Sequence, residues 1–386
     1  MIKTDAGRVA EKADSRQGKD AADQEVRLYV ASQWQLVWWR FTKHKVAVIS
    51  LWIVALLYVV TLFVEVLAPY SPNTISASHK LVPPQRLYWI DANGNFSLRP
   101  FVYPYKRERN PVTLAWVYSE ERTSKAPIKF FVSGDRYKFW GLFESDIHLF
   151  GVEGKEATLF LLGTDRLGRD LLSRIIYGTR ISMSIGLVGV AVSLILGIFF
   201  GGISGYFGGW PDLLIQRVIE VLQSVPSVPL YMALAAAMPL DWQGPQVYFA
   251  MVTILSFIGW SGMARVVRGK FLSLREEAFI KAARLSGAGE MRIILRHMVP
   301  SFLSHIIASI SLAIPGMILS ETALSFLGIG MRPPAVSWGV LLQEAQNIRT
   351  VAFSPWLLTP GVAVVAAVLA FNFLGDGLRD AADPYG

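Results

Sequence analysis

The sequence predicts an all-α integral membrane protein with six transmembrane helices and a small, mostly β insert between the first two. Three observations lead to this fold class. Of the 386 residues, 53% are hydrophobic and 17% are charged, whereas about a quarter of the residues of a soluble protein are charged. The apolar residues lie in blocks that are long enough to cross a bilayer. Basic residues gather in short connectors, which is typical of the cytoplasmic side.

The composition also excludes several classes of function. The net charge of +8 is compatible with nucleic-acid binding, but no basic stripe with interleaved aromatic residues is present, so we expect no nucleic-acid partner. Cytoplasmic connectors and anionic membrane lipid explain the charge. The absence of cysteine excludes disulfides, thiolate metal sites and cysteine nucleophiles. The five histidines are scattered, so we expect no metal site.

The chain begins with a polar segment and then enters the membrane. Residues 1–30 carry mixed charge and few large apolar residues, which predicts a disordered cytoplasmic tail rather than a signal peptide. Residues 31–68 contain an interfacial helix, with tryptophans at headgroup level, and the first span at 46–67. Because cations precede this span, we expect the chain to leave the cytoplasm here.

Residues 69–180 are predicted to form an extracytoplasmic insert. Short alternating runs at 128–132 and 137–143 indicate strands, and Asp91-Ala92-Asn93-Gly94 is a turn signal. Two roles remain open for this insert: an inert structural cap and a docking surface for a binding protein.

Residues 181–386 hold the other five spans. We place them at 181–206, 213–238, 247–267, about 301–326 and 357–374. The fifth is polar for a span, with serines that include Ser309, Ser311 and Ser320, so we expect it to face a cavity or other helices. Four further polar residues inside the membrane are candidates for lining a pathway, although interhelical hydrogen bonds are an alternative role: Glu220, Gln223, His305 and Glu321.

The connector at 269–300 between the fourth and fifth spans has a specific pattern. Ala282 and Ser286 are four residues apart, as are Ala283 and Gly287, so small side chains share one helical face. A face of small residues allows the backbone of a partner to come close.

Glycines interrupt this connector and a second helical pattern follows them. Gly287 and Gly289 are stop signals for the first helix. Apolar residues then recur at helical spacing up to Pro300, at Met291, Ile294, Leu295 and Met298. The connector is therefore predicted to be two short helices that meet at a glycine corner, with one face open for docking.

These residues resemble a known family. Ala282-Ala283, Gly287 four residues after Ala283 and Pro300 thirteen after Gly287 are similar to the cytoplasmic "EAA" loop of ABC importer permeases. The resemblance implies that this loop is a coupling helix, seated in a groove of a separate ATPase subunit. Its residues would be Lys281, Ala282, Ala283, Arg284, Ser286, Gly287 and Pro300. This chain departs from the family pattern at Lys281, where Glu is usual, and at His297 and Val299.

A second motif precedes the second span. Its residues are Gly163, Thr164, Asp165, Gly168, Arg169 and Asp170. The motif resembles a signature of the second permease subunit of dipeptide, oligopeptide and nickel importers. A catalytic role is not indicated. We expect Asp165, Arg169 and Asp170 to hold the outer end of the next helix, because a side-chain carboxylate accepts from free backbone N–H groups there.

The resemblance implies the six-helix fold of type I ABC importer permeases (the MetI-like fold) in a bacterial inner membrane, with both termini cytoplasmic. It implies four kinds of partner: a homologous second permease, two ABC ATPase subunits, an extracytoplasmic solute-binding protein and membrane lipid. The chain has no phosphate-binding loop. We therefore expect it to be no enzyme and to bind no cofactor itself, with ATP and Mg held by the ATPase subunits.

The predicted function is to form half of a translocation pathway for oligopeptides or dipeptides by ATP-driven alternating access. Import of oligosaccharides, or of nickel, by the same machinery is an alternative. An ion-coupled secondary transporter is the alternative from another class, but it predicts internal repeats and paired acidic residues at the midplane, which are not evident. A membrane-anchored enzyme lacks a catalytic constellation.

Overall fold

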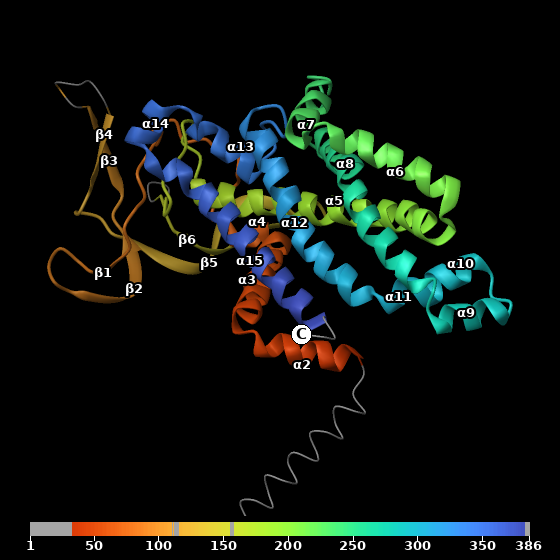
Figure 1. Ribbon diagram of the computed structural model, residues 1–386. Coiled ribbons are helices and arrows are strands. Elements are labelled where there is room, and N and C mark those ends of the chain that lie inside the picture. The colour runs from red at the N-terminus through yellow and green to blue at the C-terminus, as the bar shows by residue number, and fades with distance from the viewer. Residues whose placement is uncertain (1–32, 110, 112–115, 155–157, 383–386) are drawn as a thin grey trace, which may run out of the picture.

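The computed structural model describes residues 33–382 except 110, 112–115 and 155–157, so the polar tail predicted at 1–30 lies outside the described residues. The chain forms a bundle of helices with a set of β-strands at one end and a short helical connector at the other (Figure 1). We call these the insert end and the connector end. This arrangement is the predicted one.

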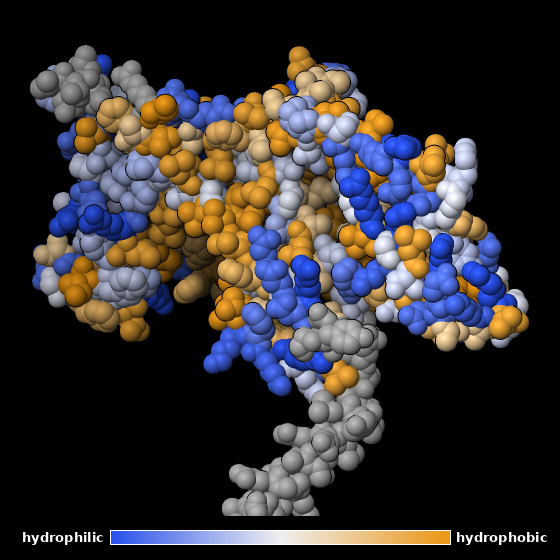
Figure 2. All heavy atoms as spheres, in the orientation of Figure 1, coloured by the Kyte–Doolittle hydropathy of each residue, from blue (hydrophilic) through white to orange (hydrophobic). Residues whose placement is uncertain are grey.

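Five helices are long and apolar enough to cross a membrane. They are α3 (Lys45–Leu62), α5 (Leu171–Phe207), α8 (Gly244–Leu274), α12 (Leu303–Phe326) and α15 (Thr359–Ala382). Helix α2 (Gln33–Lys43) precedes α3, where the interfacial helix was predicted. Figure 2 shows hydrophobic residues over the helices between the insert and the hydrophilic residues near the C-terminus.

The predicted span at 213–238 is not one continuous helix. It consists of α6 (Gly209–Ser224) and α7 (Ser227–Ala236), which are bent by 84° relative to each other. The break falls at Pro226, which has no backbone N–H to donate, and the residue before a proline is pushed out of the helical region. Val225 accordingly has φ −94° and ψ 131°. The described residues therefore contain five helices that could cross a membrane, or six spans if the bent pair counts as one.

Helix α5 begins at Leu171, ten residues before the predicted start of the second span at 181. Residues 171–180 thus belong to a helix and not to the insert. We expected them in the insert because the sequence is soluble in character up to Arg180. In the structure Arg174 is buried among carboxylates, and Arg180 is paired with Glu65 at 2.6 Å, so both charges are compensated within the helical bundle.

The insert is mostly β, as predicted. A four-stranded antiparallel sheet has the order β1 (Tyr88–Ile90), β2 (Phe96–Val102), β5 (Ala126–Phe139) and β6 (Phe143–Val152). Strands β3 (Tyr105–Arg109) and β4 (Trp116–Glu120) form a separate pair. The sheet closes on a small core that includes Val102, Ile128 and Leu159. The β5–β6 hairpin runs back to α4 (Val64–Leu67), which follows the first membrane-crossing helix.

Glycines allow α5 and α8 to touch through their backbones. A Cβ built on Gly201 lies 2.4 Å from the carbonyl oxygen of Ala264, and one built on Gly205 lies 2.7 Å from that of Arg268. Side chains at these positions would force the helices apart, which is why small residues are common where membrane helices pack closely.

The segment between α12 and α15 packs partly into the helical bundle. It contains α13 (Trp338–Gln343), the 3₁₀ turn η2 (Glu344–Gln346), α14 (Ile348–Phe353) and the 3₁₀ turn η3 (Pro355–Leu358). The side chain of Trp338 is fully buried. Its indole N–H donates to the Ile175 carbonyl at 3.2 Å and its backbone N–H to the Ser182 hydroxyl at 3.1 Å. Burial of a tryptophan inside the bundle is possible because both donors find acceptors there.

Candidate coupling and translocation site

The connector consists of two short helical segments that meet at a glycine corner. Helix α9 (Ala278–Leu285) ends before Gly287, which has φ +77°, a conformation that glycine adopts without strain. The second segment comprises α10 (Glu290–Ile293), a π-helical turn η1 (Ile294–Met298) and α11 (Val299–Ser301). The structure thus has the predicted corner, and the second segment is partly π-helical where we expected an α-helix.

The small face predicted on this connector is divided between solvent and core. Ala282, Ser286 and Gly287 are exposed, and the Ser286 hydroxyl donates to the Ala282 carbonyl at 2.9 Å. Ala283, in contrast, is half-buried and packs against a hydrophobic cluster that contains Ile280 of the same helix. The other predicted coupling residues are exposed: Lys281, Arg284 and Pro300. The exposed part of the small face is therefore centred on Ala282 and the corner rather than on Ala283.

A hydrophobic cluster holds the connector on the bundle. Ile280, Ile293 and Met298 of the connector are all fully buried. They pack in one cluster with Tyr206 of α5 and Phe271 of α8. A displacement of α9 would therefore act directly on the ends of both long helices, because a close-packed core does not deform easily.

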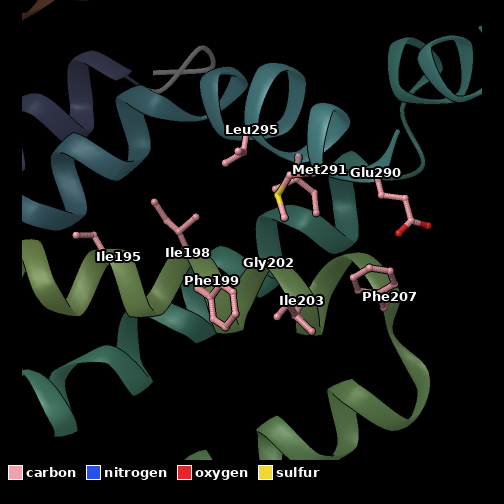
Figure 3. A pocket seen from close by; sticks show the side chains of 10 residues that line it. Ile195, Ile198, Phe199, Gly202, Ile203, Phe207, Glu290, Met291 and Leu295 are labelled. Atoms are coloured by element: carbon pink, nitrogen blue, oxygen red, sulfur yellow. The ribbon is translucent and has the colours of Figure 1, made fainter. Parts of the chain in front are cut away.

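An apolar groove separates the second connector segment from α5. Its volume is about 560 Å³, and Met291 and Leu295 lie across it from Ile198 and Phe199 (Figure 3). Met298, the last residue of the predicted apolar stripe, is in the buried cluster instead. Residues of the stripe thus line the groove and also pack in the buried cluster.

A second, partly open cavity of about 420 Å³ lies between α5, α7, α8 and α12. Ser309 and Ser320 of α12 line it, together with Ser227 and Tyr231 of α7. Hydroxyl groups are uncharged, and in an otherwise apolar wall they can form hydrogen bonds with a polar solute. The sequence pointed to the serines of this span, but it gave no signal for Tyr231.

None of the four polar residues proposed for a pathway lines this cavity. Glu321 is fully buried and accepts hydrogen bonds from Ser182 at 3.2 Å and from Ser325 at 2.8 Å, so it joins α12 to α5. The Gln223 amide donates to the Ser261 hydroxyl at 3.0 Å. These contacts correspond to the alternative role, interhelical hydrogen bonding.

The two remaining candidates lie elsewhere. Glu220 is exposed on α6 and pairs with Arg217 at 2.7 Å. His305 is half-buried on α12, one helical turn before Ser309 and on the same face.

The motif at 163–170 forms a buried ionic network at the insert end. Asp165 is fully buried; its carboxylate accepts from the Arg169 guanidinium at 2.6 Å and from that of Arg174. Both arginines also donate to Glu344, each at 3.1 Å. Because Glu344 lies in the turn after α13, the network joins the start of α5 to a segment that is distant in the sequence.

Asp170 is the N-cap of α5. Its carboxylate accepts from the Ser173 backbone N–H at 2.8 Å and from the Ser173 hydroxyl at 2.7 Å, which satisfies donors that a helix start leaves free. Burial raises the pKa of this carboxyl to about 7, although the hydrogen bonds from Ser173 oppose the shift.

The other motif residues shape the turn before the helix. Gly163 and Gly168 have φ +77° and +81°. Thr164 accepts from the Val82 backbone N–H at 2.8 Å and donates to the His79 carbonyl at 2.6 Å. Across the described part of the chain, no group of three or more His, Asp or Glu side chains is arranged to hold a metal ion.

Comparisons with known proteins identify the family. Residues 193–385 match the family described as binding-protein-dependent transport system inner membrane component. The chain belongs to this permease family. Residues 32–84 of the permease also match the N-terminal transmembrane domain of oligopeptide transport permease C. The family predicted from the connector and from the motif at 163–170 is confirmed, and so is the fold class.

Two relatives show how far the similarity extends. The permease is 42% identical to the oligopeptide transport system permease protein OppC of Haemophilus influenzae, over 58% of this chain and 69% of the relative. It is 31% identical to the dipeptide transport system permease protein DppC of Lactococcus lactis subsp. cremoris, over 92% and 91%. A chain of the inward-facing MetNI methionine ABC transporter is 16% identical, over 55% of this permease and 97% of that chain, with a TM-score of 0.44.

Proposed function

We propose that this permease forms half of a translocation pathway for oligopeptides or dipeptides and is driven by separate ATPase subunits. The names of the relatives support the substrate class. The observation that carries the proposal is the exposed small-residue surface at Ala282, Ser286 and Gly287, on a connector whose other side is locked into the bundle.

The mechanism follows from how that connector is attached. When ATP binding closes the ATPases, α9 moves with the groove in which it is seated. The buried cluster around Ile280 and Phe271 passes this movement to α5 and α8, which move together because they touch at Gly201 and Gly205. Both α5 and α8 also border the cavity that Ser309 and Ser320 of α12 line, so their rotation opens this cavity to one side of the membrane at a time.

The partners and orientation are part of the same proposal. The connector end and both termini lie in the cytoplasm of a bacterium, the insert end lies outside its inner membrane, and an extracytoplasmic solute-binding protein delivers the solute there. Exposed arginines on the connector, Arg292 and Arg296, support this orientation. A homologous second permease completes the cavity, and two ATPase subunits hold ATP and Mg. We propose no catalytic role for this chain.

The test is to fill the docking surface. Ala282→Leu should abolish co-purification with the ATPase subunits and peptide uptake, because a bulky side chain blocks close approach of the groove. Ala352→Leu is the matched control, since this alanine is also exposed but lies on α14 at the insert end. Normal assembly and uptake with Ala282→Leu would overturn the proposal.

A further inference from the structure

The tip of the β5–β6 hairpin, residues 139–143, is an exposed apolar surface that none of the contacts above explains. Leu142 is 76% exposed and Phe143 is 70% exposed, and Trp140 beside them is 48% exposed. Scattered apolar residues are normal on a protein surface, but a contiguous group of large ones indicates a partner.

The hairpin runs along the chain that leaves the first membrane-crossing helix. Away from the tip, on β6, the His148 ring nitrogen Nδ1 lies 2.5 Å from the Ala68 carbonyl oxygen. At the tip, the Trp140 indole N–H donates to the Leu62 carbonyl at 3.0 Å, and Leu62 is the last residue of α3. Along the hairpin, His148 therefore lies beside Ala68, and Trp140 at the tip lies beside the last residue of α3.

The backbone turn at the tip holds Trp140 beside the end of α3. Trp140 has φ +50° and Gly141 has φ +75°, and a tryptophan in this region of backbone space is uncommon. The indole is also covered by the Arg180 guanidinium at 4.3 Å from the ring centroid, while Glu65 compensates that charge at 2.6 Å. Tryptophan is the residue typical of the boundary between membrane and water.

Charged residues follow the apolar tip within one step of the strand register. Phe139 is opposite Phe143, and the next pair is Lys138 and Glu144, whose charges lie 3.3 Å apart and are exposed. A change from apolar to charged over such a short distance matches the boundary of a bilayer, where a lysine stem lies in the apolar layer and its ammonium group in water.

We propose that this hairpin tip inserts into the lipid leaflet at the insert end and anchors the insert to the membrane. The partner is lipid because the apolar surface of the tip is continuous with the exposed apolar surface of the membrane-crossing helix α3. Phe63, 44% exposed, stacks on Phe139 at 6.0 Å, and Leu62 and Val59 of α3, each 48% exposed, extend the same surface into the membrane-crossing helix. The insert is thus held in the membrane at a second place, beside the helices from which it emerges.

The absence of native cysteine allows a direct test. Single variants Leu142→Cys and Phe143→Cys carry a nitroxide label in the full chain, purified with its partners and reconstituted in phosphatidylethanolamine and phosphatidylglycerol nanodiscs. Collision rates with oxygen, which concentrates in lipid, and with Ni(II)EDDA, which stays in water, are compared. Trp52→Cys, 71% exposed in the middle of α3, is the lipid reference, and Leu98→Cys, 88% exposed on β2, is the aqueous reference.

We expect the ratio of oxygen to Ni(II)EDDA collision rates at positions 142 and 143 to shift from the Leu98 value towards the Trp52 value. A ratio equal to that at Leu98 would mean that the tip lies in water, and this result overturns the proposal. Low rates with both reagents would mean that another protein covers the tip, which overturns it as well. Because both side chains are exposed, the labels do not disturb the packing of the insert.

Discussion

Arg174 shows how an arginine is accommodated inside a helical bundle at the scale of single residues. Its side chain is 1% exposed and contacts Asp165 and Glu344. Arg174→Leu leaves these carboxylates without one of their partners, and removal of one partner of a buried ion pair costs about 3–5 kcal/mol. We expect a marked fall in the unfolding temperature, measured by size-exclusion chromatography after heating in detergent.

Arg217→Leu is the matched control for this substitution. Arg217 and Glu220 also form a close pair, at 2.7 Å, but their side chains are 70% and 52% exposed. Exposed pairs contribute about 0–1 kcal/mol, so the unfolding temperature should barely change. Equal losses in the two variants would contradict a structural role for the network at the insert end.

Gly287 tests the corner of the connector through its backbone alone. Apart from the glycine and its two chain neighbours, no atom lies within 4 Å of a Cβ built on Gly287 or on Gly289. Only Gly287 has a positive φ, +77°, while Gly289 has −65°. Gly287→Ala should therefore distort α9 at a cost of about 1–2 kcal/mol and reduce recovery of the ATPase subunits. Gly289→Ala should leave recovery unchanged, and equal recovery from the two variants would show that the corner is not needed for assembly.

At the scale of elements, the contact of α5 with α8 depends on glycines that face α8 directly. A Cβ at Gly201 meets the Ala264 carbonyl oxygen at 2.4 Å, whereas one at Gly202 meets the Phe271 ring at 3.4 Å. Gly201→Ala should force the helices apart and destabilise the permease by about 1–3 kcal/mol, as overpacking does. Gly202→Ala should be tolerated, because it adds helix propensity without a clash.

Detergent stability and peptide uptake together check this pair of variants. If α5 and α8 move as one unit, Gly201→Ala should reduce uptake by more than its loss of folded protein explains. Comparable behaviour of Gly201→Ala and Gly202→Ala would argue against the backbone contact as the link between connector and cavity.

At the scale of the whole molecule, the proposed alternating access predicts that the cavity changes its exposure during transport. Ser309→Cys and Ser320→Cys lie in the cavity wall, with Ser309 nearer the connector end. In the assembled importer, a charged thiol reagent added on the connector side should label Ser309→Cys in the resting state. It should fail to do so after ATP hydrolysis has trapped ADP and vanadate in the ATPase subunits. Ser320→Cys should respond in the opposite sense to reagent added on the insert side.

Ser311→Cys is the control for this experiment. Its side chain is buried and its hydroxyl donates to the Ile307 carbonyl at 3.1 Å, so it should stay unlabelled in both states. Labelling of Ser309→Cys that is independent of nucleotide would be inconsistent with access that alternates.

The sequence by itself determined the class of protein, the family, the insert and the glycine corner of the connector. These features depend on hydropathy and on spacings within about 20 residues, which follow from the helix and strand periods. The third span was predicted as one continuous helix, so the break within it was missed, although Pro226 was a local signal for that break.

Only the tertiary structure decided which polar residues face the cavity and which are buried in contacts. Glu321 meets Ser182, and Arg174 meets Glu344, across separations of 139 and 170 residues, and no local pattern encodes such pairs. Ala282 and Ala283 are adjacent in the sequence, yet one is exposed and the other packs on the core. The direction in which a helix faces its neighbours is set by the packing of the whole bundle, so the sequence alone left it open.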